Sequence, residues 1–296
     1  MTGARHYTDD ERRHFLRYTR TTSWPMLRRF PVADELHTEL LAQMLATTAA
    51  TVESLERSLA GEVEASAARL MADERYREAV TGLPFDPGDR IVAVGDSITA
   101  DRLGWFDLLA ASVRRAGPPP PGLVNLGVSG NTTADVLERF DLLEEAKPTR
   151  VLLMLGTNDA RVHGRRGGYR MATVAETERN LGALTTLITR DLNASVTVIT
   201  PPAVDQVRAD QFFRDAPVRW EATDVAEVAE VVHRAAPDAI DLHRATRTHP
   251  GDLLESDGVH PNRSGQQFIL RRVIDHLRTN RLAGTRSNRT LMSHPG

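Results

Sequence analysis

The segment Ile91-Val92-Ala93-Val94-Gly95-Asp96-Ser97-Ile98-Thr99 contains an apolar run, a short turn and a serine in direct succession. A short apolar run without polar interruptions is typical of a strand buried on both faces of a parallel sheet. The glycine and aspartate that follow predict the turn into a helix. Ser97 is therefore expected at the carboxyl end of a buried strand, where the next helix starts.

The same alternation continues along the chain. We interpret residues 123–124, 151–155, 196–199 and 239–242 as further strands, and residues 102–115, 133–146, 174–190 and 221–236 as amphipathic helices. Strands that alternate with helices form a parallel sheet with helices on both faces. We expect a three-layer α/β/α fold with five parallel strands in a flavodoxin-like order, and a functional site at their carboxyl ends.

Residues 1–85 have a different pattern and are predicted to form a helical N-terminal extension. The segment Thr8-Asp9-Asp10-Glu11 fits a capping box at the start of a helix. Between Leu36 and Met71, apolar residues recur at spacings of three and four, which predicts one long helix or a helical hairpin with a candidate break at Gly61. This stripe either packs on the rest of the chain or forms a homodimer through the N-terminal helices.

The turn residues at 83–89 separate this extension from a predicted domain over residues 86–282. From residue 283 to residue 296 the apolar periodicity stops, and we expect a disordered tail.

The composition excludes several classes of function. The chain has 296 residues, 26% of them charged, a net charge of -3 and no cysteine. Disulfides, thiolate catalysis and cysteine zinc sites are therefore excluded, and the charge gives no reason to expect nucleic acid as a partner. The sequence shows no secretory signal and no run long enough to span a membrane, so we expect a cytoplasmic location.

Two residues near strand ends are candidates for acyl-transfer chemistry beside Ser97. Gly130 follows the second strand, and a glycine there allows the backbone N–H to approach a bound acyl group. Asn158 follows the third strand and offers a neutral amide donor for a negative oxygen. All three candidates also have a purely structural alternative. The alternatives are an N-cap serine for Ser97, a turn glycine for Gly130 and a turn cap for Asn158. Asp159 is assigned to such a cap on local backbone.

The segment Asp257-Gly258-Val259-His260-Pro261 places a carboxylate three residues before a histidine. Because Pro261 disfavours helix for the preceding residue, we expect a bent loop in which both side chains reach one spot. Asp257 can then accept a hydrogen bond from one ring nitrogen of His260 while the other faces Ser97. A metal site here is the weaker alternative, because no third protein ligand is evident.

Two further segments are expected to wall the site. Residues 161–170 are strongly basic, and they either receive an anionic group or form a solvated loop. Residues 204–220 contain Phe212, Phe213 and Trp220, which form either an apolar lid or core packing against the N-terminal helices.

These motifs together resemble the signature blocks of the SGNH (GDSL-type) hydrolase superfamily. The resemblance runs from about residue 91 to residue 277 and rests on Gly95-Asp96-Ser97, Gly130, Asn158 and the pair Asp257 and His260, without a departure within the blocks. It implies a nucleophile at Ser97, a triad with Asp257 and His260, and an oxyanion hole from Ser97, Gly130 and Asn158. The superfamily fold agrees with the predicted α/β/α layers. No metal and no organic cofactor is implied.

The resemblance also implies an esterase that hydrolyses a small-molecule carboxylic ester with a small or medium acyl group. Two alternatives remain open: an acyltransferase that uses the same acyl-enzyme, and a catalytically silent binding or scaffold protein. The sequence leaves the physiological ester, the oligomeric state and the role of residues 1–85 undetermined.

Overall fold

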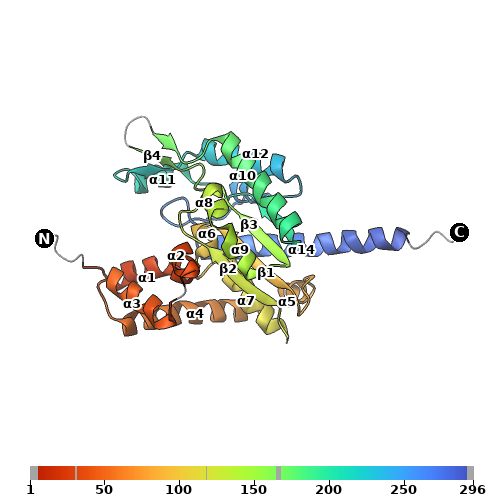
Figure 1. The fold of residues 1–296 in the computed structure, drawn as a ribbon, viewed down its shortest axis with the longest axis horizontal. Coiled ribbons are helices and arrows are strands. Elements are labelled where there is room, and N and C mark those ends of the chain that lie inside the picture. The colour runs from red at the N-terminus through yellow and green to blue at the C-terminus, as the bar shows by residue number, and fades with distance from the viewer. Residues whose placement is uncertain (1–5, 31, 118, 165–167, 292–296) are drawn as a thin grey trace.

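The computed structural model describes residues 6–30, 32–117, 119–164 and 168–291. Its centre is a parallel sheet with the strand order β2-β1-β3-β6 (Figure 1). The four strands are β1 (Arg90–Gly95), β2 (Gly122–Gly127), β3 (Arg150–Met154) and β6 (Ser195–Ile199). This order is the flavodoxin-like order expected for the first four strands, so the ends of β1, β2 and β3 lie side by side at one edge of the sheet.

The fifth strand expected at residues 239–242 is reduced to a single parallel bridge, between Ile240 and Ile199. The Ile240 N–H donates to the carbonyl of Val198, and the Ile240 carbonyl accepts from Thr200. The pairing stops because Asp241 caps the helix α13 (Leu242–Arg247) through the Arg244 N–H. The prediction of five regular strands is therefore wrong at this edge, although the segment lies in the expected place.

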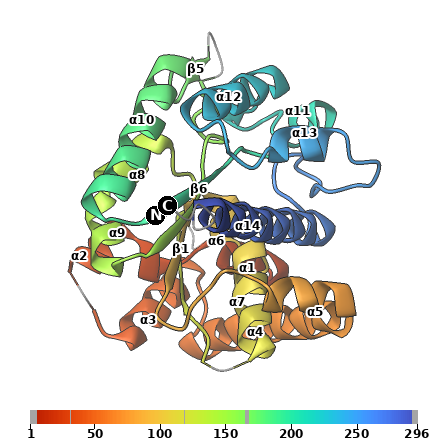
Figure 2. The ribbon, with the colours of Figure 1, turned by 90° about the vertical axis from the view of Figure 1, so that its right-hand side faces the viewer.

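Helices cover both faces of the sheet, as Figure 2 shows. In β1, Ile91 and Ala93 belong to one buried cluster, whereas Val92 and Val94 belong to another on the opposite face. The first cluster includes α5 (Glu74–Thr81), α7 (Trp105–Ala116) and the first part of α14 (Arg263–Leu291). The second includes α8 (Thr133–Glu138), α9 (Phe140–Ala146), α10 (Val174–Thr186) and α12 (Ala222–Ala235).

The N-terminal extension consists of α1 (Asp9–Tyr18), a 3-10 turn (Thr21–Ser23), α2 (Pro25–Arg29), α3 (Asp34–Met44) and α4 (Ala49–Ala72). The predicted capping box is present, since Thr8 and Glu11 each accept from the other's backbone N–H. The apolar stripe forms a helical hairpin, α3 and α4. However, α4 continues through Gly61 without the expected break, because the surrounding turns supply enough good helix formers.

The apolar stripe of the extension packs on the chain itself, as one of the two interpretations expected. Val52 and Leu59 of α4 form a buried cluster with Leu16, Leu41 and Leu45. Further along α4, residues 63–71 join the core that includes α7. Most of the stripe is therefore covered by the chain's own side chains, whereas Leu36 and Met44 of α3 are exposed.

The C-terminal helix departs from the expected boundary at residue 282. The backbone of residues 283–291 is helical and continues α14 away from the rest of the chain (Figure 1), whereas residues 292–296 lie outside the described residues. A helix already started at Arg263 can be extended at little cost, because elongation avoids the expensive nucleation step and no proline intervenes. The described ranges contain no helix that is both long and apolar enough to cross a membrane.

A small antiparallel sheet, β5-β4-β7, lies beyond the carboxyl end of β3. It is formed by β4 (Val162–His163), β5 (Tyr169–Arg170) and β7 (Val218–Arg219). Because Val162 pairs with Arg219, the residues Arg161 and Trp220 are brought next to each other. The other elements of the described residues include a π-helical turn (Leu187–Asp191) and α11 (Gln206–Phe212).

Candidate active site

Ser97 is the first residue of the short helix α6 (Ser97–Ala100), directly after β1. The cap of this helix is Asp96, whose carboxylate accepts from the Ile98 N–H at 2.9 Å. The alternative that Ser97 is an N-cap is therefore wrong, and its hydroxyl is available for another partner. That partner is His260, whose Nε2 lies 2.8 Å from the Ser97 Oγ.

The His260 ring is held at its other nitrogen by Asp257. Nδ1 of His260 lies 2.6 Å from one carboxylate oxygen of Asp257, and the second oxygen accepts from the backbone N–H groups of Val259 and His260. The carboxylate is thus fixed by backbone donors and presents one oxygen to the ring. Ser97, His260 and Asp257 form a continuous chain of hydrogen bonds, as expected from the bent loop.

The environment shifts the pKa of both partners of this pair. Burial alone would lower the pKa of His260, but the hydrogen bond and the negative charge of Asp257 outweigh it, and the pKa is raised above 6.5. Burial would raise the pKa of Asp257, but the hydrogen bond and the charge of His260 hold it below 3.8. Asp257 is therefore ionised at neutral pH.

The loop that carries this pair is fastened at several points. The His260 carbonyl accepts from the Glu255 N–H at 2.8 Å, and the Gly258 carbonyl accepts from the Asp205 N–H at 2.8 Å. Gly258 has a φ of 70°, and a Cβ at this position would lie 2.6 Å from the Asp205 carbonyl oxygen. Only glycine fits this left-handed turn, which directs both side chains to one place.

Gly130 and Asn158 line the same cavity as Ser97 and His260. Gly130 has a φ of 85°, a left-handed conformation that a side chain would strain. The buried amide of Asn158 donates from Nδ2 to the Asn131 carbonyl at 3.2 Å, which fixes its orientation. Since that nitrogen carries a second hydrogen, one N–H remains for a group in the cavity.

Asp159 has a different role from the local turn cap that we expected. It is fully buried and accepts hydrogen bonds from the backbone and hydroxyl of Thr133 and from the hydroxyl of Thr177. It therefore links the end of β3 to α8 and α10, in addition to a hydrogen bond with its own backbone N–H. The sequence could not reveal this, because both partners are distant along the chain.

The cavity has a volume of about 350 Å³. Its lining residues include four of the residues predicted for the site and one residue next to His260: Ser97, Gly130, Asn158, His260 and Val259. The others are His14, Phe15, Tyr18, Thr19, Ser129, Thr157, Arg161 and Trp220. The aromatic and aliphatic side chains give it a mainly apolar wall.

The N-terminal helix α1 contributes residues that the sequence did not identify as part of the site. His14, Phe15 and Tyr18 lie on one face of this helix and line the cavity, and the Tyr18 ring packs against the His260 ring. Tyr18 follows His14 by four residues and Phe15 by three, and these spacings bring its side chain near both of theirs on a helix. Nothing in the local sequence indicates which part of the protein these side chains contact.

Long-range polar contacts fix α1 in this position. Arg17 forms a two-pronged ion pair with the buried carboxylate of Asp101, at 2.7 and 2.8 Å, and also contacts Glu255 at 2.7 Å. The Tyr18 carbonyl accepts a hydrogen bond from the Ser129 hydroxyl. The extension is therefore connected to the serine, glycine and histidine segments at once.

Only some residues of the two segments expected to wall the site line the cavity. Arg161 lines the cavity, whereas Arg170 forms an ion pair with Glu227 at 2.7 Å, and residues 165–167 lie outside the described residues. Trp220 also lines the cavity, and its indole N–H donates to the Thr157 carbonyl at 2.9 Å.

The aromatic residues of the second segment do not pack against the N-terminal helices. Trp220 is buried in the core beside α10 and α12, and Phe213 packs against it with ring centroids 4.8 Å apart. Phe212 is 57% exposed. Core packing is thus the better description for Trp220 and Phe213, although the expected partner was wrong.

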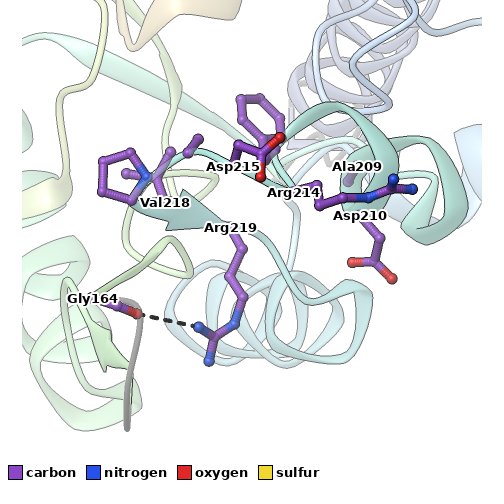
Figure 3. A pocket seen from close by; sticks show the side chains of 10 residues that line it. Gly164, Ala209, Asp210, Arg214, Asp215, Val218 and Arg219 are labelled. Atoms are coloured by element: carbon purple, nitrogen blue, oxygen red, sulfur yellow. Dashed lines mark hydrogen bonds between the residues drawn. The ribbon is translucent and has the colours of Figure 1, made fainter.

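A larger cavity of about 470 Å³ lies between the end of α11 and β7 (Figure 3). Its wall includes Asp210, Arg214 and Arg219, but none of the five residues predicted for the site. The size of a cavity therefore does not locate the chemistry here. Within the described ranges, no three His, Asp or Glu side chains are grouped so that they could hold a metal ion.

Residues 93–268, more than half of the chain, match the model of the GDSL-like lipase/acylhydrolase family. The chain belongs to this family. The match spans all five predicted site residues and excludes the N-terminal helices α1 to α5. No curated protein matches the chain in sequence.

Several solved structures are similar to this chain over about two thirds of its length. A lipase/acylhydrolase from Enterococcus faecalis is 26% identical with a TM-score of 0.52, over 64% of this chain and 96% of that protein. LAE5, a hydrolase from the metagenome of Lake Arreo in Spain, is 24% identical with a TM-score of 0.52, over 65% and 96%. The acetyl xylan esterase AlAXEase is 21% identical with a TM-score of 0.51, over 62% and 97%. The similarities to LAE5 and AlAXEase, both below 25% identity, show only that the fold is shared.

Proposed function

We propose that this GDSL-type protein is a serine esterase that hydrolyses a carboxylic ester through an acyl-enzyme on Ser97. The observation that carries the proposal is the hydrogen-bond chain from the Ser97 Oγ to His260 at 2.8 Å and from His260 to Asp257 at 2.6 Å. A serine hydroxyl becomes an effective nucleophile when an adjacent base can take its proton and a third group orients that base.

In the first step, His260 Nε2 takes the Ser97 proton while the Ser97 oxygen bonds to the acyl carbon. The carbonyl oxygen becomes negative and is stabilised by the N–H groups of Ser97 and Gly130 and by the amide of Asn158. His260 then gives its proton to the alcohol oxygen as the carbon–oxygen bond breaks. Asp257 stabilises the imidazolium that exists between these two transfers.

In the second step, water replaces the alcohol. His260 takes a proton from the water as its oxygen bonds to the acyl carbon, and returns the proton to Ser97 as the acyl-enzyme bond breaks. The products are the free acid and the regenerated serine. The cycle needs no redox reagent.

The cavity favours a small or medium acyl group. Its volume of about 350 Å³ is at the lower end of the range for small-molecule sites, and Tyr18 and Trp220 bound it with buried aromatic rings. The likeness to the lipase/acylhydrolase from Enterococcus faecalis supports ester chemistry in general.

The proposal is tested with 4-nitrophenyl acetate, butyrate and octanoate, together with labelling by a fluorophosphonate probe. We expect the short esters to be hydrolysed and Ser97 to be labelled, and we expect Ser97→Ala to lower kcat by about 10³-fold or more with no labelling. Undiminished turnover by Ser97→Ala would refute the proposal, and a protein that neither turns over esters nor reacts with the probe is the silent scaffold.

The same assay separates a hydrolase from an acyltransferase. With an added alcohol acceptor, a hydrolase releases mainly free acid, whereas an acyltransferase forms mainly the new ester. We expect free acid to dominate.

A further inference from the structure

Among the residues that the structure describes, Arg161 in the wall of the Ser97 cavity forms no ion pair with an aspartate or a glutamate. Arg161 lines the cavity, and none of the residues that line it is an aspartate or a glutamate. The Nε of Arg161 is buried without a hydrogen-bond partner. Neighbouring arginines differ, because Arg17 pairs with Asp101 and Arg20 with Asp107.

The position of Arg161 is set by the backbone on both sides. Its N–H donates to the Asn158 carbonyl at 3.2 Å, and its carbonyl accepts from the Met171 N–H at 2.9 Å. Its guanidinium lies 6.0 Å from the centre of the Trp220 ring. The backbone that carries Arg161 is thus fixed, and its guanidinium lies beside the indole ring of Trp220.

The guanidinium also lies close to the groups that we assign to the oxyanion hole. A Cβ built on Gly130 would be 3.7 Å from Nη1 of Arg161, an ordinary contact distance. A substrate whose acyl carbon is at Ser97 therefore occupies the same cavity as the guanidinium. Burial lowers the pKa of Arg161, since the opposing influence of Asp135 and Asp96 is weaker.

We infer that Arg161 binds an oxyanionic group of the substrate, so that the preferred substrate is an ester with a negative charge near the scissile bond. A planar guanidinium is well suited to a carboxylate, because it can donate two parallel hydrogen bonds. Nη1 is the donor of Arg161 that lies near Gly130. This inference rests on the proposed esterase function.

Two pairs of substrates test the inference and show on which side of the ester the charge lies. In the first pair, 4-acetoxybenzoate and its methyl ester differ in charge on the alcohol side. In the second, mono-4-nitrophenyl adipate and its methyl ester differ in charge on the acyl side. We expect the wild-type protein to have a higher kcat/KM for the anionic member of one pair, and Arg161→Met to lower that value about 10- to 100-fold while sparing the neutral member.

Two further variants serve as controls. Arg161→Lys keeps the charge and is expected to retain part of the preference. Arg219→Met removes the same charge from a neighbouring segment, but this guanidinium pairs with Glu221 and is directed toward the Gly164 carbonyl in a different cavity (Figure 3). We expect Arg219→Met to leave the preference unchanged.

Three results would overturn the inference. They are equal kcat/KM values within both pairs, an equal loss on all four substrates in Arg161→Met, and a loss of preference in Arg219→Met as large as that in Arg161→Met. In each case, hydrolysis of the neutral esters and labelling of Ser97 would leave the esterase proposal standing. Failure of every ester together with absence of labelling would overturn both.

Discussion

The Tyr18 ring packs against the His260 imidazole, with ring centroids 4.9 Å apart and planes inclined by 48°. Tyr18 is the last residue of α1 and lies outside the region that matches the family, whereas His260 lies within it. One face of the proposed catalytic base is therefore bounded by the N-terminal extension. The Tyr18 hydroxyl is buried without a hydrogen-bond partner.

This contact predicts different effects for two substitutions of Tyr18. Tyr18→Ala removes the ring that confines the imidazole, and we expect kcat/KM for 4-nitrophenyl acetate to fall about 10-fold or more. Tyr18→Phe keeps the ring and removes an unpartnered polar group, so activity is maintained and the free energy of unfolding is unchanged or higher by up to about 1 kcal/mol. Steady-state kinetics and urea unfolding measure both. A large loss of activity in Tyr18→Phe would show instead that the hydroxyl binds substrate.

The raised pKa of His260 predicts the pH dependence of hydrolysis. The base must be neutral to take the Ser97 proton, so kcat/KM increases as pH rises through the pKa of His260, which lies above 6.5. In Asp257→Asn the charge that raises this pKa is lost while burial remains. The acid limb of the profile should therefore move to lower pH, and kcat should fall about 10³- to 10⁴-fold.

The control for this pH profile is His243, which does not line the cavity. His243→Asn should leave the acid limb in place. An unchanged limb in Asp257→Asn would contradict the assignment of His260 as the titrating base.

The proposed role of the Asn158 amide predicts that its removal lowers kcat and leaves substrate binding unchanged. We expect Asn158→Ala to lower kcat about 10²- to 10³-fold with little change in KM, because the negative oxygen exists in the transition state and not in the bound ester. Thermal unfolding checks that the fold is retained after the Asn131 carbonyl loses its partner. A rise in KM at constant kcat would instead assign Asn158 to ground-state binding.

The ion pair between Arg17 and Asp101 predicts that the stability of the fold and the position of α1 depend on neutralising a buried carboxylate. The Asp101 side chain is fully buried, so Arg17→Met leaves a carboxylate without its counter-ion. We expect the free energy of unfolding to fall by about 3–5 kcal/mol, measured by urea denaturation, and activity to fall as well because α1 carries residues of the cavity wall.

Arg29 is the matched control, since it pairs with Glu138 and Asp141 at the surface. Solvent screens these charges, and Arg29→Met should cost much less stability than Arg17→Met. Equal losses of unfolding free energy in the two variants would contradict the prediction that burial makes the Arg17 ion pair more important for stability.

Much of the central domain follows from local sequence patterns. The apolar run before Ser97 is β1, and the first four strands have the expected order. The fifth strand was less predictable, since its apolar residues do not reveal that Asp241 caps a helix after a single bridge. The helix beyond residue 282 was missed for a related reason, because elongation does not require apolar periodicity.

The sequence by itself determined which five residues would share one edge of the sheet. Ser97, Gly130 and Asn158 each follow a parallel strand, and parallel strands end on the same side. Asp257 lies three residues before His260 in a loop that turns at Gly258, and the two side chains meet. Tertiary structure alone decided that α1 lines the cavity and that Arg161 has no counter-ion within the part of the chain that the structure describes. Those features depend on pairings such as Arg17 with Asp101 and Val162 with Arg219. Such contacts join residues far apart in the chain, and short-range spacing carries no signal for them.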